Sequence, residues 1–292
     1  MAVAVARTTP IGFIGLGNLG QPMALNLIDR GWTLRVADTK PERLHPVVEA
    51  GATAAKPADL GACRVICFVV PDDEAIRAVL DRGVRELLTS DHLLVVHSTT
   101  LPHRARDLAG SIASETGARY LDAPVSGGSA RARAGELTAF VGGESADIDA
   151  ATILLQDEAD QIFPLGSIGA ASATKLANQL IAFSALAGVH ESLQLTNAYG
   201  VDDDQALAAI ATATGDTWVG RNLAFWDQTT LDYDRAGVPL ADRPWRKDLL
   251  EVLATARDIG VDVPHAGLLS ELLPPMVEQH ARTVAARPED RD

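Results

Sequence analysis

Residues 11–38 read IGFIGLGNLGQPMALNLIDRGWTLRVAD and decide the fold of the first half of the chain. The apolar run Ile11–Ile14 predicts a strand that leads directly into Gly15-Leu16-Gly17-Asn18-Leu19-Gly20, which fits the pattern GxGxxG. A helix then follows, and a second predicted strand over 33–37 ends at Asp38. A strand, a glycine-rich turn, a helix and a strand ending in a carboxylate form, in this order, a dinucleotide-binding fingerprint.

Each glycine of this turn has its own physical task. Gly15 permits the tight turn, Gly17 lets the backbone approach a pyrophosphate, and Gly20 lets the helix pack closely on the strand. The helix N-terminus then faces the phosphates with its partial positive charge. Leu16, Asn18 and Leu19 complete the loop, so the whole segment 15–20 is expected to bind the cofactor.

Asp38 indicates which dinucleotide is bound. A carboxylate at this position accepts hydrogen bonds from the ribose hydroxyls and repels a 2′-phosphate. The next residue is Thr39, not the arginine that is frequent in NADP-binding proteins, although Lys40 follows. We therefore expect NAD or NADP, with NAD favoured.

The chain continues in strand-helix units up to about residue 141. Continuous apolar runs predict parallel strands buried on both faces. Residues 65–70 form such a run, and further strands are predicted over 93–96, 119–122 and 137–141. Helices are expected from 71 to about 80 and from 102 to about 115, which predicts an α/β domain.

Several polar or glycine-rich segments directly follow these strands. Ligands gather at the carboxyl ends of strands in such a sheet, so Val70, Pro71 and Thr99 are expected at one cleft. Ser126, Gly127 and Gly128 offer a hydroxyl and exposed N–H groups that could hold a carboxylate. The same three residues would also suit an ordinary flexible loop.

Residues 166–200 read GSIGAASATKLANQLIAFSALAGVHESLQLTNAYG and predict one long helix, with Ser172 as its cap and Gly200 as its end. No residue from Leu176 to Val189 is charged, so we expect a helix buried on every side that joins two domains. The expected domains are 1–165, which binds the dinucleotide, and 166–292, which is all-helical. Further helices are expected over 202–213, 218–226, 245–259 and 267–285, the last interrupted at Pro274-Pro275.

Lys175 is the unusual residue of this apolar helix. It lies three positions before Asn178, so the two side chains share one helix face. A lysine at the mouth of a domain interface is a candidate acid or base. The alternative is a lysine that extends to water at a helix start.

Composition narrows the class of protein. The 292 residues are 47% hydrophobic and carry a formal net charge of −14, which argues against nucleic-acid or anionic-membrane partners. Cys63 and Cys67 indicate buried free thiols in a reducing compartment. No apolar run is long enough to span a membrane and the N-terminus does not resemble a signal peptide, so a cytoplasmic location is expected.

The sequence suggests no metal site. His97 and His103 are six residues apart, which matches no common zinc spacing, and neither a cysteine nor a carboxylate completes a set along the sequence. Both histidines are expected at the surface or at the cleft edge.

Four motifs stand in a characteristic order: GLGNLG at 15–20, LDAPVSGG at 121–128, GSIGAASATKLANQ at 166–179 and KDL at 247–249. Together they resemble the β-hydroxyacid dehydrogenase family. The resemblance implies a Rossmann-type domain, an all-α domain and NAD(P)-dependent interconversion of a short, anionic 3-hydroxy acid and its semialdehyde.

The resemblance also assigns roles to individual residues. It implies that Lys175 is catalytic, that Asn178 is its substrate-binding neighbour, and that Thr99 and Lys247 lie beside the nicotinamide. It further implies a carboxylate cradle made of Ser126, Gly127 and Gly128.

Two departures and three alternatives accompany the resemblance. Ala171 replaces a glycine of the family, and Arg243-Pro244-Trp245 is bulkier than its counterpart in many relatives, which bears on substrate size. An imine reductase shares the architecture but usually lacks the lysine at position 175, and a non-catalytic dinucleotide-binding module is the second alternative. A phosphogluconate-type decarboxylating enzyme is the third, although such relatives are much longer.

The apolar long helix predicts a homodimer or homotetramer.

Overall fold

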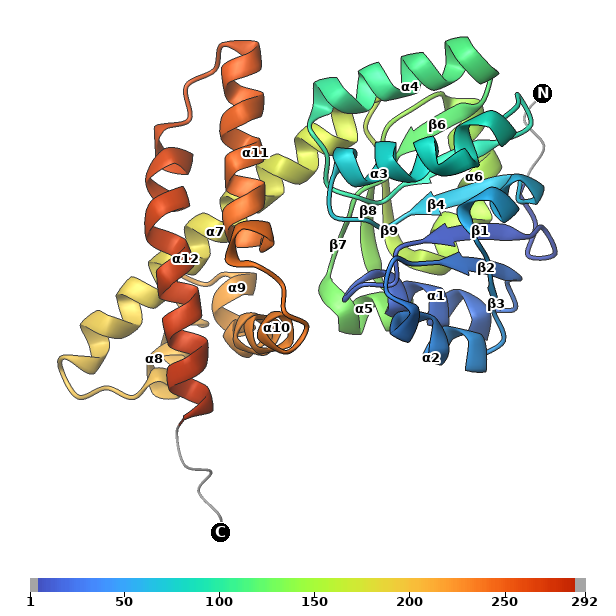
Figure 1. Ribbon diagram of the computed structural model, residues 1–292. Helices are drawn as coiled ribbons and strands as arrows, with labels where there is room; N and C mark the ends of the chain where they lie inside the picture. Colours follow the sequence, from blue (N-terminus) through green and yellow to red (C-terminus); the bar gives the residue numbers. More distant parts are fainter. Residues whose placement is uncertain (1–4, 287–292) are drawn as a thin grey trace. The chain divides into compact units, whose positions relative to one another are not determined.

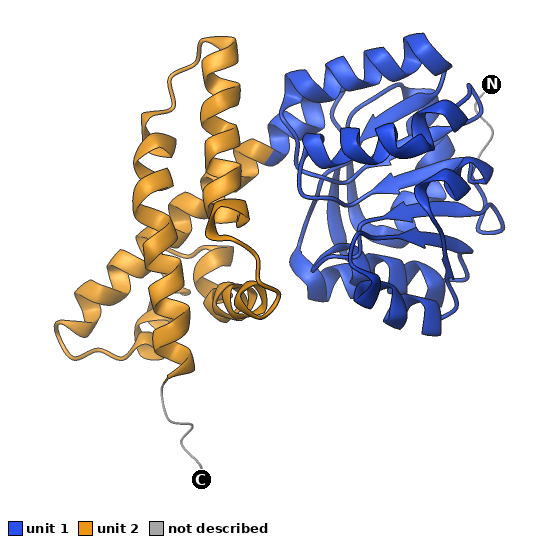
Figure 2. Ribbon diagram, viewed as in Figure 1, with its two compact units in different colours: residues 1–175 blue, residues 176–292 orange. Residues whose placement is uncertain are grey.

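The computed structural model describes residues 5–286 and divides into two compact units, residues 1–175 and residues 176–292 (Figure 2). Unit 1 is α/β, and the described part of unit 2 is built from helices. Their boundary falls inside the long helix α7 (Ala170–Asn197). The expected fold class is confirmed, while the division into 1–165 and 166–292, which leaves α7 whole, stays a prediction.

A six-stranded parallel sheet forms the centre of unit 1 (Figure 1). Its spatial order is β3-β2-β1-β4-β5-β6, and the direction of the chain order reverses between β1 and β4. That order is the Rossmann topology, in which ligands bind at this reversal point. The strands are β1 (Ile11–Ile14), β2 (Leu34–Ala37), β3 (Thr53–Ala54), β4 (Val65–Phe68), β5 (Leu93–Val96) and β6 (Arg119–Asp122).

Helices cover both faces of this sheet because the strands are apolar on both faces. Phe13, Cys67 and Val95 face the side on which α1 and α6 pack, whereas Phe68 and Val96 face α3 and α4. Successive side chains of a strand alternate between faces, so a continuous apolar run fills both cores. The helices of unit 1 are α1 (Gly20–Asp29), α2 (Leu44–Glu49), α3 (Asp73–Val79), α4 (Pro102–Thr116), α5 (Gly128–Ala134) and α6 (Ser145–Glu158).

A second, three-stranded sheet follows β6. It consists of β7 (Val125–Ser126), β8 (Leu137–Val141) and β9 (Ala159–Pro164), with β7 antiparallel and β9 parallel to β8. The predicted strand 137–141 therefore exists, but it belongs to this second sheet. A bridge between Asp122 and Gly142 joins the end of β6 to the end of β8.

Unit 2 packs its helices around large side chains. Phe183, Trp226, Trp245, Leu249 and Leu273 lie in its apolar core. No helix within residues 5–286 is long and apolar enough to cross a membrane. Beyond its share of α7, the unit contains α8 (Asp203–Ile210), α9 (Trp218–Arg221), α10 (Leu223–Arg235), α11 (Pro244–Ile259) and α12 (Pro264–Ala285).

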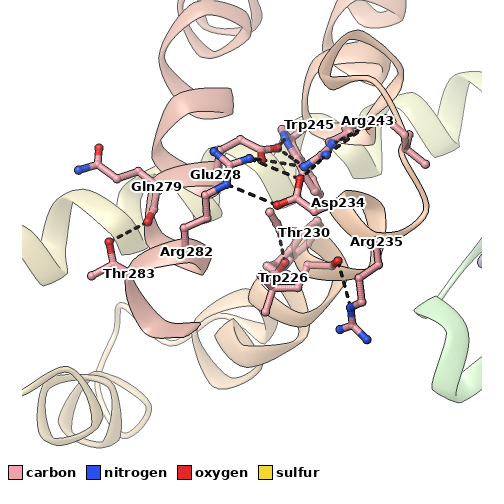
Figure 3. A network of polar contacts seen from close by, with 12 residues as sticks. Trp226, Thr230, Asp234, Arg235, Arg243, Trp245, Glu278, Gln279, Arg282 and Thr283 are labelled. Carbon is pink, nitrogen blue, oxygen red and sulfur yellow. Dashed lines mark hydrogen bonds and ion pairs between the residues drawn. The ribbon is translucent and has the colours of Figure 1, made fainter. Parts of the chain in front are cut away.

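A buried ionic network ties α10, α11 and α12 together (Figure 3). The guanidinium of Arg243 donates to both carboxylate oxygens of Glu278, at 2.9 and 2.7 Å, and to Asp234 at 2.6 Å. The indole N–H of Trp245 also donates to Glu278, at 3.1 Å. The Arg243 side chain is only 3% exposed, so the network fixes the start of α11 from inside the core.

Two expectations about helices were wrong. α12 runs without interruption through Pro274 and Pro275. Pro274 has no N–H to donate to the Ser270 carbonyl one turn earlier, and Arg246 of α11 donates to that carbonyl instead, at 3.4 Å. α7 is not buried on every side of the single chain, because Ile181 is 72% exposed and Leu195 65% exposed.

Candidate functional site

The loops that follow β1, β2, β4 and β5 lie at one edge of the parallel sheet. The N–H of Gly15 donates to the carbonyl of Ala37 at 2.9 Å, and that of Val69 donates to Ile14 at 2.8 Å. These bonds continue the pairing just beyond the strands, so neighbouring loops start in register. The glycine loop, Asp38, Val70 and the segment 98–100 are thus collected at this edge.

The glycine loop is tight at its two ends and open in its middle. Gly15 has φ +96°, and a Cβ atom there would lie 2.2 Å from the Val69 carbonyl oxygen. A Cβ on Gly20 would lie 2.0 Å from the Gly15 oxygen, whereas one on Gly17 would meet only Arg43, at 3.8 Å. Backbone atoms of other segments therefore do not approach Gly17, which lies just before the N-terminus of α1. The side chain of Leu16 is buried, Leu19 is half-buried, and Asn18 is exposed.

Asp38 is held at the end of β2 by backbone donors. Its carboxylate accepts the N–H of Leu16 at 2.6 Å and that of Lys40 at 2.8 Å. The guanidinium of Arg43 lies 3.7 Å from the same carboxylate. Arg43 was not predicted, because it does not directly follow Asp38 in the sequence and only a short turn of chain brings it back to the loop.

Val70, Pro71 and Thr99 occupy the adjacent loops. The hydroxyl of Ser98 accepts the N–H of Val70 at 3.0 Å, which joins the loop after β4 to the loop after β5. Val70 and Thr99 are half-buried and Pro71 is exposed. All three side chains are therefore at or near the surface of the edge.

Ser126, Gly127 and Gly128 form the turn between β7 and α5. Gly127 has φ +140° and Gly128 has φ +77°, a region that side-chain-bearing residues rarely adopt. A Cβ on Gly127 would also lie 3.0 Å from the Leu137 side chain. Glycine is therefore required at 127 for backbone reasons, whatever the turn binds.

Asp122, at the end of β6, fixes the first turn of α7. Its Oδ2 accepts the N–H groups of Gly169 and Ser172, each at 3.0 Å, and the Ser172 hydroxyl at 3.3 Å. Burial raises the pKa of Asp122, while these hydrogen bonds oppose the shift. Ser172 therefore lies inside the helix and is not its cap, and the sequence analysis gave Asp122 no role.

Lys175 lies one turn after Ser172 on α7 and is buried, with 8% of its surface exposed. The hydroxyl of Ser172 is 3.2 Å from that of Thr100 on the loop after β5. The helix start that carries Lys175 is thus tied to two strand ends of unit 1. A lysine that merely extended into water would be exposed, so its burial argues against that alternative.

Asn178, Gln179, Asp248 and Lys247 form a chain of polar contacts within unit 2. Asn178 donates to the amide oxygen of Gln179 at 3.2 Å, and Gln179 donates to Asp248 at 2.6 Å. Lys247 contacts the other oxygen of Asp248 at 2.8 Å and Glu251 at 3.1 Å. Gln179 and Glu251 were not predicted, because their contacts link α7 to α11 and depend on tertiary packing.

The charge of Lys247 is held in place by its neighbours. Burial disfavours the ammonium, but the carboxylates of Asp248 and Glu251 outweigh this effect and raise the pKa of Lys247. The side chain therefore stays cationic at physiological pH. A group that stays charged is poorly suited to exchange a proton.

Burial changes the interpretation of several residues that the sequence singled out. Trp245 is fully buried in the core of unit 2 and Arg243 is 3% exposed, so their bulk fills the core and does not line a binding surface. His97 is buried and not at the surface, and the fold brings Cys67 and Glu158 to it. Both cysteines are free and buried, as expected.

Two family models together match most of the chain. Residues 10–166 match the NAD binding domain of 6-phosphogluconate dehydrogenase, and residues 169–285 match the model described as NAD-binding of NADP-dependent 3-hydroxyisobutyrate dehydrogenase.

Two relatives similar in sequence are named 3-hydroxyisobutyrate dehydrogenase. The mitochondrial 3-hydroxyisobutyrate dehydrogenase of Homo sapiens is 33% identical over 219 residues, which are 74% of this chain and 65% of that protein. The match thus spans less than two thirds of the human protein. The 3-hydroxyisobutyrate dehydrogenase of Pseudomonas aeruginosa is 32% identical over 273 residues, 90% of this chain and 91% of that protein.

Solved structures share the fold. The 3-hydroxyisobutyrate dehydrogenase of Mycobacterium tuberculosis with L-serine has a TM-score of 0.77 and 24% identity, and covers 96% of this chain and 100% of that one. An imine reductase of Streptomyces aurantiacus has a TM-score of 0.65 and 23% identity, over 95% and 94% of the two chains. At these identities the likeness concerns the fold alone.

Proposed function

We propose, from the premise that this chain belongs to the β-hydroxyacid dehydrogenase family, that it is an NAD(P)-dependent oxidoreductase acting on a CH–OH group. Its substrate is a short, anionic 3-hydroxy acid, and its product the corresponding semialdehyde. The observation that carries the proposal is the burial of Lys175 near a helix start that Asp122 and Thr100 hold through Ser172. Buried lysines are rare in proteins and are therefore candidates for a functional role.

The glycine loop and Asp38 would hold the dinucleotide. The open space over Gly17 would receive the pyrophosphate, and Asp38 would accept hydrogen bonds from the ribose. Val70, Pro71 and Thr99 would line the same edge, and Lys247 would lie beside the nicotinamide. When bound, the nicotinamide would take the hydride from carbon 3 of the hydroxy acid.

Lys175 would exchange the proton of the reacting oxygen. In the oxidative direction the hydroxyl oxygen loses its proton to the lysine, and in the reductive direction the ammonium returns one to the carbonyl oxygen. A cationic donor also stabilises the negative charge that develops on that oxygen. Asn178 would bind the substrate by neutral hydrogen bonds, and Ser126, Gly127 and Gly128 would hold its carboxylate.

The finer cofactor preference is proposed to be NAD over NADP. Asp38 is an acid at the ribose position, which disfavours a 2′-phosphate. Arg43 lies 3.7 Å from that acid and offsets part of its charge. The preference should therefore be modest.

A homodimer, or a homotetramer built from dimers, is also proposed. Ile181, Leu195 and Tyr199 are 72%, 65% and 84% exposed and fall on one stripe along α7 and its end. Large apolar side chains in such a stripe favour cover by another chain. Light scattering at micromolar concentration would contradict this if it gave the mass of a single chain.

A substrate panel tests the reaction class. The purified protein is assayed with 3-hydroxy acids and NAD or NADP, and with semialdehydes and cyclic imines and either reduced cofactor, by absorbance of the reduced nicotinamide. Turnover of hydroxy acids or semialdehydes supports the proposal. Turnover of imines alone would make the chain an imine reductase, and no cofactor binding by calorimetry would overturn the enzymatic role.

A further inference from the structure

Cys67, His97 and Glu158 form a buried cluster within unit 1, and none of them has a role in the reaction proposed above. Cys67 is on β4, His97 directly follows β5, and Glu158 is the last residue of α6. Cys67 pairs in register with Val95, so the alternation of side chains places residue 97 on the same sheet face as Cys67. α6 packs on that face and brings Glu158 to the other two residues.

The donor atoms of the three side chains converge. One potential ligand atom from each residue lies within 4.8 Å of the other two, and Nε2 of His97 is 3.5 Å from Oε1 of Glu158. Nδ1 of His97 is 2.9 Å from the carbonyl oxygen of Ala123. A carbonyl only accepts, so Nδ1 carries the hydrogen and neutral His97 presents the lone pair of Nε2 to the cluster. Metal-binding histidines show this arrangement of their second nitrogen.

The cluster is short of hydrogen-bond partners in a region without solvent. Nε2 of His97 and both carboxylate oxygens of Glu158 are buried and make no hydrogen bond. The two side chains are 0% and 1% exposed. Buried carboxylates in native proteins are paired or coordinate a metal. A protonated His97 would pair with Glu158 across their 3.5 Å contact, whereas a metal ion would hold neutral His97 and Glu158 together.

We propose that Cys67, His97 and Glu158 bind a divalent transition-metal ion, and that zinc is the ion their donors select. Sulfur, imidazole nitrogen and carboxylate oxygen are the ligands of protein zinc sites. With zinc bonds of about 2.0–2.2 Å and tetrahedral angles, N and O ligands lie about 3.4 Å apart, close to the 3.5 Å between His97 and Glu158.

Charge balance also favours a divalent cation. A thiolate and a carboxylate together neutralise a 2+ ion, so the occupied cluster is electrically neutral in the core. A thiol must lose its proton to bind the ion, so metal affinity should increase with pH.

The position of the ion indicates what it does. It would connect β4, the segment after β5 and the end of α6, three elements far apart in the sequence. Ser98, next to His97, accepts the N–H of Val70 and so joins two loops of the cofactor edge. An ion at this place would hold the three elements together at this edge, and it would take no part in the reaction itself.

The test measures metal content on the full chain. After growth with zinc and gel filtration, mass spectrometry should find about one zinc per chain, as for a structural site. Cys67→Ser and Glu158→Gln should each reduce this content at least tenfold. Cys63→Ser is the matched control, because Cys63 is also buried and free but lies outside the cluster, and it should keep its zinc.

Cobalt absorbance and thermal unfolding are both measured on the parent protein, so they do not require the variants to fold. Cobalt(II) added to the parent protein should give a thiolate charge-transfer band, and zinc should raise the unfolding temperature of metal-depleted protein. The proposal is overturned if depleted parent protein takes up less than a tenth of an equivalent of zinc and shows neither effect. Equal zinc in the parent and in folded Cys67→Ser would also overturn it. Because every readout is independent of turnover, failure here leaves the proposed reaction intact.

Discussion

α7 and α11 each carry, near their start, a lysine that the sequence singles out, and the two helix starts are anchored in opposite ways. At α7 a buried acid, Asp122, binds backbone N–H groups and one hydroxyl. At α11 a buried base, Arg243, binds the side-chain carboxylates of Glu278 and Asp234. At α7 the helix dipole balances the charge of Asp122. At α11 the carboxylates of Glu278 and Asp234 balance the charge of Arg243.

The difference bears on what each lysine can do. Lys247 lies against Asp248 and Glu251, whose charges raise its pKa and keep it protonated. Lys175 lies beyond an anchor whose acid is directed at backbone groups. The proposed roles, proton exchange for Lys175 and substrate binding for Lys247, can be separated by experiment, and the following predictions would break or sharpen that contrast.

The largest effect is expected for Lys175→Ala. Losing a general acid and base costs about 10²–10⁴ in turnover, while cofactor affinity should change little. Lys175→Arg should also be poor, since arginine stays charged and does not readily release a proton. Lys247→Ala should instead act mainly on KM, because it removes binding charge.

Steady-state kinetics on the best substrate, with cofactor titration by fluorescence, checks this contrast. The exposed Lys56→Ala is the control and should match the parent. Turnover of Lys175→Ala within threefold of the parent would end the catalytic assignment.

The next effect concerns the α11 anchor. Arg243→Ala leaves Glu278 buried without its main partner, and breaking a buried pair costs about 3–5 kcal/mol of unfolding free energy. Arg282 also contacts Glu278 and Asp234 but is 54% exposed, so Arg282→Ala should cost less than about 1 kcal/mol. Urea unfolding measures both, and equal losses would show that burial does not distinguish the two arginines.

Acid should weaken unit 2 through His190. Burial, with a smaller contribution from His280, lowers the pKa of His190 to about 4. The unfolded chain then binds more protons between about pH 6.5 and pH 4, so stability is full above this window and falls through it, by up to about 3 kcal/mol. Asp122 acts oppositely in unit 1, because its raised pKa favours proton uptake by the folded state.

Tryptophan fluorescence resolves the two units in such a titration. Trp218, Trp226 and Trp245 belong to unit 2, whereas Trp32 belongs to unit 1. Unfolding free energies at pH 7 and pH 4.5 should differ for the parent and differ less for His190→Gln. A parent that keeps its stability down to pH 4.5 would contradict the lowered pKa.

The smallest effect is expected at the cofactor edge. Asp38→Ala should reduce the preference for NAD, and Arg43→Ala should increase it, each by no more than about tenfold, or about 1.4 kcal/mol. Competitive titration of NAD and NADP gives both ratios, with the exposed Lys56→Ala as control. If Arg43→Ala leaves the ratio unchanged, the arginine does not reach the bound ribose.

The sequence predicted the buried strands and the glycine loop because their signals are local. A continuous apolar run such as residues 65–68 has few alternatives to a buried strand. It missed β3 and β9, whose residues are largely exposed and give no such run. It also missed α6, whose apolar residues do not form a clear stripe.

Within the candidate site, the residues missed are those that act through tertiary contacts. Asp122 lies 47 residues before Gly169, and Gln179 lies 69 before Asp248. No periodicity connects such positions. The sequence predicted His97 at the surface or the cleft edge, because Cys67 and Glu158 are far from it along the chain and only the fold brings the three together.

The unit boundary lies within α7, and this position limits where related genes can recombine without disrupting the helix. Helical hydrogen bonds join residues four apart, so several of the bonds in α7 connect a residue before the boundary at 175 to a residue after it. Recombination at the boundary would therefore cut through a continuous helix, whereas a crossover in the loop at 165–169 would leave it whole. A C-terminal half exchanged at this loop would carry both Lys175 and Asn178. Asp122 would remain in the N-terminal half, which carries the glycine loop. Lys175 and its anchor Asp122 would then come from different parents, so each new combination of halves would have to restore the contact between Asp122 and the start of α7.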